Sequence, residues 1–427
     1  MLRVRHRIVA VGASVLSLVV GLSTEAQEAR PRQITLDQAL EEAFARSPIL
    51  RAQRAEVDQA EGRFITARTY PFNPEFSVEA ARRRGELEST TDYNIILSQE
   101  IEIGGKRRRR VEQAGAEQDA ELGQFLRAQR LLAARVRAAF IEALRARELV
   151  EVDQANAELA NSLTEVARKR FEAGAAPQME VNLALVQVGR ARRDLRLSRG
   201  AYQVALTILA EIVGLDPDNP PVPVGELTLP SRDVPAFSEL LASALQQRAD
   251  LEAFRDTVRA ARARTEVARR QRVPNLMTGA SYGEEEETDR LVGGFVGVRI
   301  PIFNRNRGAI AEANGLLQQA EAKQLAVELQ VRQEVASSLA RYQAAVESTT
   351  NLQAQVLGSL QENLELLQHS FEAGKTSWTE VLVFRREFVD VRREYVETLT
   401  EARLAGIEMD LATGVAPSLS TYEESQR

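Results

Sequence analysis

The chain contains the tetrapeptide FEAG twice, at residues 171–174 and again at 371–374 of its 427 residues. When residue n is placed over residue n + 200 from the first FEAG to Gly214, ten of 44 positions are identical without a gap. Residues 35–70 fit 236–270 at an offset of 201. Chance recurrence of common residues does not produce this agreement. The chain is therefore a tandem duplication of a unit of about 200 residues, far longer than a solenoid repeat.

One long segment of each unit has the pattern of a supercoiling helix. Residues 106–171 and 307–371 contain no proline, and their apolar residues recur at three- and four-residue spacing. At 1.5 Å per residue, each segment predicts a helix of roughly 100 Å. Each FEAG turn is followed by a shorter helix, so that two helical hairpins are predicted at about 106–213 and 307–413.

Two further helices, at about 34–70 and 236–272, are predicted to precede the strand regions. Two short helices placed end to end match one long helix in length. We expect 177–213 to stack on 236–272, and 377–413 to stack on 34–70, which would close the two units into one body.

Residues 75–103 and 275–303 have a different pattern. Each contains two segments in which apolar residues alternate with small or polar ones, joined by a polar turn. These four segments of about 9–12 residues have the length of membrane-spanning strands. Four strands cannot close a barrel and lipid does not tolerate an open edge, so a membrane role requires several copies of the chain. The alternative is a soluble β-hairpin packed on the helices.

The first 26 residues have the order of a secretory signal peptide. Three arginines precede an apolar run from Ile8 to about Leu22, and small residues follow. This segment predicts export and a mature chain that starts near Gln27; the alternative is a buried N-terminal helix. After residue 27 no stretch approaches the roughly 20 apolar residues of a membrane helix.

Composition removes most catalytic and metal sites from consideration. The chain has no cysteine and two histidines, His6 in the signal segment and His369. Sites built from His and Cys ligands, and Ser–His–Asp arrangements, therefore lack their residues. We expect no enzyme activity, no cofactor and no resident metal. The formal net charge of −6 gives no reason to expect a nucleic-acid partner.

Several motifs, taken in order over residues 33–414, resemble the TolC-like outer-membrane efflux factors. They are ITLDQALEEAFARSPIL, SQEIEIGGKR, PIFNRNRGAIAEA, RFEAGAAPQMEV and SFEAGKTSWTEVL. The IGGKR and FNRNRG forms are most similar to the heavy-metal branch typified by the cobalt-zinc-cadmium system. The resemblance implies a mainly α fold with a β-barrel contribution. In it, a homotrimer forms a twelve-stranded outer-membrane β-barrel, four strands from each protomer, and a periplasmic α-barrel of coiled helical hairpins.

The resemblance also implies a function and a domain organisation. The function is a passive exit duct for heavy-metal cations, joined by a periplasmic adaptor to an inner-membrane pump of the resistance-nodulation-division type. A drug or protein-secretion duct, or a soluble periplasmic coiled-coil adaptor, are the alternatives. The expected organisation is a signal peptide at 1–26, a first repeat at 27–214, a Pro-rich equatorial linker at 215–235, a second repeat at 236–414 and a tail at 415–427.

The family places the turns that match FEAG at the periplasmic entrance. Gly174 and Gly374 can adopt the positive φ that reverses a chain after a helix. We expect Phe171 and Phe371 to pack between neighbouring coils. Family members often close the entrance with an arginine and a tyrosine, but Phe371 has no hydroxyl, so Lys375 paired with a carboxylate is the hypothesis for closure.

Two charged groups complete the candidate sites. Glu180 and Glu380 match positions where the family often carries acids facing the lumen, which in a trimer would favour cations; stabilisation of a helix N-terminus is the alternative. A basic cluster lies where strand passes into helix, at the periplasmic face of the membrane. Five cations there oppose the helix dipole, so we expect a compensating lipid phosphate or, alternatively, carboxylates of neighbouring protomers. The cluster comprises Lys106, Arg107, Arg108, Arg109 and Arg110.

Overall fold

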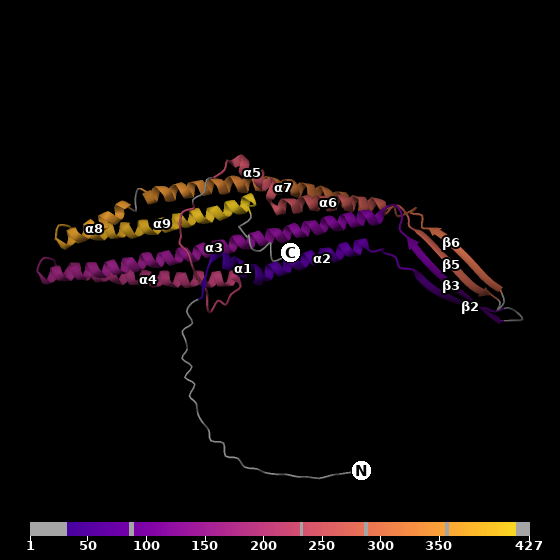
Figure 1. Cartoon of the computed structure of the whole chain (residues 1–427), viewed down its shortest axis with the longest axis horizontal. Helices are drawn as coiled ribbons and strands as arrows, with labels where there is room; N and C mark the ends of the chain where they lie inside the picture. Colours follow the sequence, from indigo (N-terminus) through magenta and orange to yellow (C-terminus); the bar gives the residue numbers. More distant parts are fainter. Residues whose placement is uncertain (1–31, 85–88, 231–233, 286–288, 355–357, 416–427) are drawn as a thin grey trace, which may run out of the picture.

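The computed structural model describes residues 32–84, 89–230, 234–285, 289–354 and 358–415. It has a long helical body with a sheet extending from one end (Figure 1). The predicted signal peptide and residues 416–427 of the predicted tail lie outside the described residues. The helices are α1 (Leu36–Arg46), α2 (Pro48–Arg68), α3 (Lys106–Glu172), α4 (Gln178–Val213), α5 (Phe237–Gln247), α6 (Ala249–Arg270), α7 (Arg307–Leu352), α8 (Gly358–Glu372) and α9 (Trp378–Thr413). The strands are β1 (Gln33–Ile34), β2 (Glu75–Arg84), β3 (Ser89–Ile101), β4 (Val222–Pro223), β5 (Leu276–Glu285) and β6 (Asp289–Val298).

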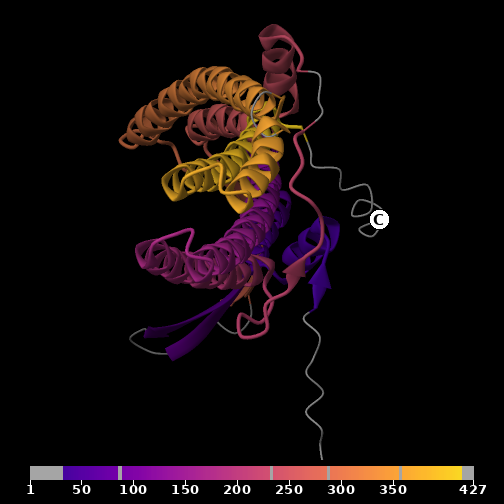
Figure 2. The same ribbon diagram turned by 90° about the vertical axis from the view of Figure 1, so that its left-hand side faces the viewer.

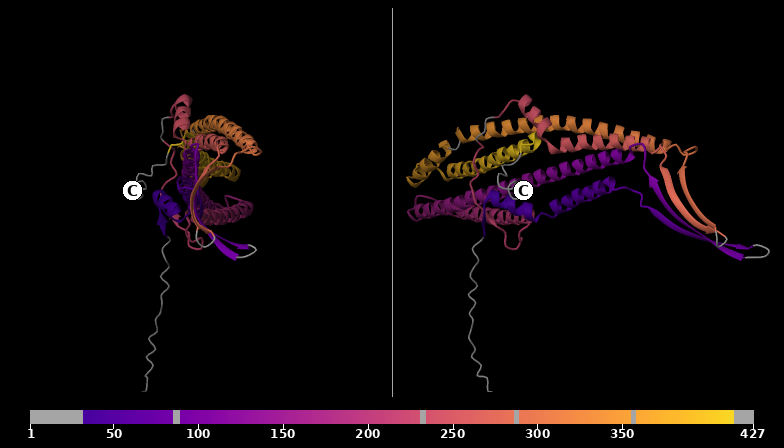
Figure 3. Two further views of the ribbon diagram at one scale, coloured as in Figure 1. Left: turned by 90° about the vertical axis from the view of Figure 1, so that its right-hand side faces the viewer. Right: turned by 45° about the vertical axis from the view of Figure 1, so that its right-hand side comes forward.

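The four long strands form one antiparallel sheet in the order β2-β3-β5-β6, which confirms the predicted strands. The two units join where β3 pairs with β5, with Leu97 opposite Ala280. The sheet runs beyond the helices as a curved ribbon (Figure 3). Apolar side chains on it are exposed, among them Phe76 at 66% and Val292 at 82%. In a single chain β2 and β6 each pair with one strand, so both edges of the sheet are open.

The first long helix is continuous and the second is not. α3 has 67 residues, which corresponds to about 100 Å. α7 begins at Arg307 as predicted but ends at Leu352, residues 353–354 are wound as a π-helix, and α8 begins at Gly358. Glycine costs about 1 kcal/mol relative to alanine inside a helix, which favours a break here. The prediction of one unbroken helix over 307–371 is wrong.

Both predicted helices at 34–70 and 236–272 are divided into two. Pro48 begins α2, and proline forces the preceding residue out of the helical region, so Ser47 has ψ 118°. The equivalent break in the second unit falls at Arg248, with ψ 113°. Each break makes a corner near the middle of the helical body (Figure 1).

The C-terminal ends of α4 and α9 pack against these corners. Gly214, which follows α4 with φ 79°, lies against Arg46 at the end of α1. Gly414, which follows α9 with φ 75°, lies against Arg248. Each helix therefore meets the corner of its own unit, and the expected stacking between units is wrong. A duplicated sequence carries equivalent signals at both corners, and packing on α3 does not distinguish them, because α2, α4, α6 and α9 all lie along it.

The apolar cores are concentrated near these corners. The larger core joins α1, α3, α4 and α9, with Val136 and Leu209 fully buried. The smaller one joins α5, α6, α7 and α9. Viewed end-on, the helices form an open arc (Figure 2). The segment after α4 contains β4, which pairs in parallel with β1 and so ties this segment to the start of α1.

We expect Gly123→Ala to lower the free energy of unfolding. An added Cβ would lie 2.6 Å from Cβ of Ala253 and 3.0 Å from the carbonyl oxygen of Ala249, where α3 crosses α6. Overpacking of this kind costs about 1–3 kcal/mol. Gly115→Ala in the same helix is the control, because its Cβ would meet the ring of Phe64 at 3.5 Å, an ordinary contact. Denaturant titration followed by circular dichroism measures both, and equal losses would contradict the prediction.

Candidate functional site at the helix turns

The two FEAG turns lie at the end of the body opposite the sheet (Figure 1). The Ala175 N–H donates to the Arg170 carbonyl at 2.8 Å, and the Lys375 N–H donates to the Ser370 carbonyl at 2.9 Å. Gly174 and Gly374 have φ of 72° and 69°. Both turns are therefore Schellman motifs, which require a residue in the left-handed region. No atom lies within 4 Å of an added Cβ at either glycine, so backbone conformation rather than space selects glycine.

The two FEAG phenylalanines have different environments. Phe371 is fully buried, and its ring centroid lies 5.5 Å from that of Trp378. The same apolar cluster includes Ala167 of α3 and Ala184 of α4. Phe171 is 40% exposed. Within one chain, Phe371 is covered by side chains of α3, α4 and α9, whereas Phe171 is partly exposed. Packing of both rings between neighbouring coils of an assembly stays a prediction.

Arg170 joins the two turns. Its guanidinium carbon lies 4.7 Å from the ring centroid of Phe371, and its Nη1 donates to the Phe371 carbonyl at 3.3 Å. A cation over an aromatic face stabilises by about 0.5–2 kcal/mol, more when water is excluded. Sequence reasoning missed Arg170. The available signal was the mismatch between the two units, since Ser370 occupies the equivalent position and cannot make this contact.

The two acids after the turns also differ. Glu380 belongs to a capping box: its carboxylate accepts from the Ser377 N–H at 2.8 Å, and the Ser377 hydroxyl accepts from the Glu380 N–H at 3.3 Å. The backbone and side-chain hydrogen bonds from Ser377 hold the pKa of Glu380 below its usual value. Glu180 follows Pro177, which offers no side-chain cap, and one Glu180 carboxylate oxygen is buried without a hydrogen-bond partner among the residues that the structure describes.

Lys375 is exposed and its side chain makes no ion pair with any residue that the structure describes. The hypothesis that Lys375 closes the entrance through a carboxylate therefore finds no partner among the described residues, and it stays a prediction.

The basic cluster at the start of α3 is at the other end of the body, where the helices meet the sheet. Lys106 is buried, and its Nζ donates to Oδ1 of Asn275 at 2.5 Å. The Arg110 guanidinium binds both carboxylate oxygens of Glu102. These contacts tie the start of α3 to the strand ends of both units.

The remaining cluster members have separate partners. Arg107 donates to the Arg68 carbonyl at 2.6 and 3.0 Å, which places a cation at the C-terminus of α2. Arg109 pairs with Glu112 at 2.8 Å. In the described part of the chain, Arg108 alone of the five has no hydrogen bond or ion pair. Within one chain Arg109 and Arg110 are paired with carboxylates, whereas Lys106 and Arg107 donate to neutral oxygens. The expected external anion stays a prediction.

Among the helices in the described ranges, none has the length and hydropathy of a membrane-spanning helix. In the same ranges, no group of three or more His, Cys, Asp or Glu side chains is placed to hold a metal ion.

Comparison with known proteins gives the family. The sequence model of the outer membrane efflux protein family matches the chain twice, over residues 39–215 and 240–415. The chain belongs to the outer membrane efflux protein family. Its two matches correspond to two copies of one unit, each with a strand pair and a helical hairpin.

Named relatives of this efflux protein differ in cargo. It is 27% identical over 388 residues to the cobalt-zinc-cadmium resistance protein CzcC of Cupriavidus metallidurans, covering 89% of this chain and 90% of the relative. It is 26% identical over 414 residues to the pyoverdine export outer membrane protein OpmQ of Pseudomonas putida, covering 89% and 85%. The crystal structure of CusC has the same fold, with a TM-score of 0.75 at 20% identity over 89% of this chain and 92% of CusC.

We expect Arg170→Gln to loosen the second turn. The variant loses the cation over the Phe371 ring and shortens the donor that reaches the Phe371 carbonyl. Trp378 is the single tryptophan of the chain and is 6% exposed, so its fluorescence reports on this contact directly. Emission should shift to longer wavelength as water reaches the indole. Arg168→Gln is the control, since Arg168 makes only an exposed ion pair with Glu165; an equal shift there would contradict the prediction.

We expect the start of α9 to lose stability in acid. A carboxyl whose folded pKa is lowered contributes stability that is present above its unfolded pKa and lost as pH falls through the folded value. For Glu380 this places the loss below about pH 4.5. Glu380→Gln keeps the acceptor but cannot titrate, so its unfolding midpoint should vary less with pH than that of the wild type. Parallel pH profiles would refute the assignment.

Proposed function

We propose that three copies of this efflux protein form an outer-membrane exit duct for heavy-metal cations. The duct receives its cargo passively from an inner-membrane pump of the resistance-nodulation-division type through a periplasmic adaptor. The observation that carries the proposal is the arrangement of the duplicated chain. A four-stranded sheet with two unpaired edges lies at one end of the molecule, and the two helix turns lie at the other end.

Assembly of several copies is supported by surfaces that one chain leaves open. β2 and β6 have unpaired edges, which closure of a twelve-stranded barrel by three copies would satisfy. Helix α4 carries two groups of exposed apolar side chains at heptad-like spacing, a spacing typical of a seam for a neighbouring coil. The first group is Met179, Leu183 and Val186 and the second is Leu197 and Val204, with Arg190 and Arg193 at the heptad positions between them.

The turn end is proposed as the periplasmic entrance. The contact of Arg170 with Phe371, whose ring lies against Trp378, supports the second hairpin being held against the first there. Glu180 and Glu380 follow these turns, and in a trimer their six carboxylates would favour cations over anions. Arg108 and its neighbours would face the headgroups at the opposite end, where the strands begin.

The proposed cargo rests on the similarity to named relatives. Similarity to a cobalt-zinc-cadmium resistance protein supports metal cations, and similarity to a pyoverdine exporter keeps export of an organic chelate as the second candidate. A soluble adaptor is disfavoured by the two helical hairpins and the open sheet of this chain.

Complementation tests the proposal. A strain that keeps its metal pump and adaptor but lacks its outer-membrane duct should regain growth on zinc, cobalt and cadmium when it expresses this chain. The outer-membrane fraction should contain a heat-modifiable trimer. Gly374→Ala, which places a side chain where φ is 69°, is a variant expected to weaken the turn by about 1–2 kcal/mol. Restored chelate export without metal resistance would overturn the cargo, and purely soluble material would overturn the duct.

A further inference from the structure

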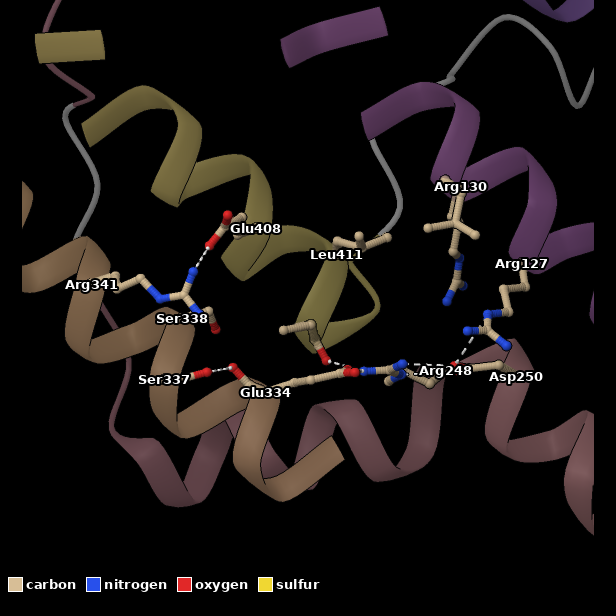
Figure 4. A pocket seen from close by; sticks show the side chains of 12 residues that line it. Arg127, Arg130, Arg248, Asp250, Glu334, Ser337, Ser338, Arg341, Glu408 and Leu411 are labelled. Carbon is tan, nitrogen blue, oxygen red and sulfur yellow. Dashed lines mark hydrogen bonds and ion pairs between the residues drawn. The ribbon is translucent and has the colours of Figure 1, made fainter. Parts of the chain in front are cut away.

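A charged pocket of about 280 Å³ lies at the corner where the end of α9 meets α5 and α6 (Figure 4). Side chains of α3, α6, α7 and α9 line it, together with Arg248 between α5 and α6. Its volume is at the lower end of the range for sites that bind small molecules, roughly 300–1,000 Å³. Four arginines face three carboxylates there: Arg127, Arg130, Arg248, Arg341, Asp250, Glu334 and Glu408.

All three acids of the pocket are already bound. Arg248 donates to both oxygens of Asp250, at 3.0 and 2.7 Å, and to Glu334 at 2.5 Å. Arg341 donates to Glu408 at 2.8 Å. Two of the four arginines therefore use the carboxylates that the pocket supplies.

Arg127 and Arg130 point from α3 toward this bound group (Figure 4) and have hydrogen-bond donors to spare. Among the described residues Arg127 makes no hydrogen bond, and its Nε lies 3.9 Å from a carboxylate oxygen of Asp250 to which Arg248 already donates. Both Nη atoms of Arg130 donate to one backbone carbonyl, that of Gln247, at 3.1 Å each. Burial lowers the pKa of Arg130, because its cation has lost part of its water. Each guanidinium carries five N–H donors, and residues three apart share a helix face, so this wall of the pocket can receive an anion.

The duplicated fold does not need charges at this corner. At the offsets of 200 and 201 that align the two units, none of the seven charged lining residues has a charged counterpart. The counterparts are Val327, Gln330, Ser47, Ile141, Ile49, Ala134 and Ile208. The end of α4 meets the corner at Ser47 without such a charged group, so the charges of the second corner point to binding rather than to the fold.

We propose that Arg127 and Arg130 bind a small oxyanion, a carboxylate or phosphate group with a single negative charge. A monoanion balances the one positive charge that four arginines and three carboxylates leave in the pocket. The planar guanidinium fork matches either group through two parallel hydrogen bonds. The ligand lies between α3 of the first unit and α7 and α9 of the second, so its binding holds the two units together at this corner. The site is independent of the proposed duct, because binding needs only the folded chain.

A thiol placed in the pocket tests its occupancy, because the chain has no cysteine of its own. Ser337 lines the pocket and is half-buried, so Ser337→Cys in the full purified protein should react with a small neutral thiol reagent. Sodium phosphate or sodium acetate should slow this reaction to a plateau, relative to sodium chloride at the same ionic strength. The salt that protects at the lower concentration identifies the preferred group. Ser348→Cys is the matched control, since Ser348 is an exposed residue of α7 outside the pocket, and it should react at one rate in all three salts.

The donors are then removed in the Ser337→Cys background. Arg127→Gln with Arg130→Gln removes two charged donors and should raise the anion concentration for half-protection at least about tenfold. Arg127→Lys with Arg130→Lys keeps the charges without the fork and should give an intermediate value, which carries the test if the glutamine variant does not fold. Arg135→Gln, an exposed arginine of α3 outside the pocket, should leave the value unchanged. Equal protection by chloride, equal protection of Ser348→Cys, or protection that survives both pairs of substitutions unchanged would overturn the proposal.

Discussion

The packing of short helices along the 67-residue helix α3 is the contact on which the rest of the structure depends. Helices from both units, α2, α4, α6 and α9, all lie against it. No single short helix can cover about 100 Å, so two must meet end to end beside it. That requirement produces the corners at Ser47 and Arg248 and the glycines that end α4 and α9 with positive φ. It also explains why Gly123, where α6 crosses α3, has no room for a side chain.

The duplication gives two units that share the same order of helices and strands but differ in their side-chain contacts. At the turns, Phe371 is buried under Arg170 while Phe171 is exposed. At the corners, Arg248 is bound by Asp250 and Glu334, whereas its counterpart Ser47 accepts a hydrogen bond from the Leu50 N–H. In a ring built from three such chains, unlike turns and unlike corners would alternate. The chain therefore carries within one protomer an asymmetry that a ring of six identical units would lack.

Sequence reasoning succeeded where signals are local. Alternation located the strands, and the duplicated FEAG located both turns with their left-handed glycines. Sequence reasoning failed to find contacts between residues that are distant in the chain. Arg170 and Phe371 are 201 residues apart, and Lys106 finds Asn275 169 residues away. The predicted stacking of α4 and α9 was wrong for a related reason. The sequences at the two duplicated corners are too similar to show which helix end meets which corner. The break between α7 and α8 has only a weak propensity signal.

The two acids that follow the turns, Glu380 and Glu180, differ in the hydrogen bonds that their own chain gives them. Glu380 accepts the bonds of its capping box, and these same bonds lower its pKa and keep it ionised, so capping and a charge facing the lumen are compatible. Glu180 has a buried carboxylate oxygen that no group in the described part of its chain hydrogen-bonds. Burying an acceptor without a hydrogen bond costs about 1–3 kcal/mol, and more for a charged group. Water, a cation or a donor from a second copy can remove that cost, so Glu180 is the acid whose environment depends on assembly or on cargo.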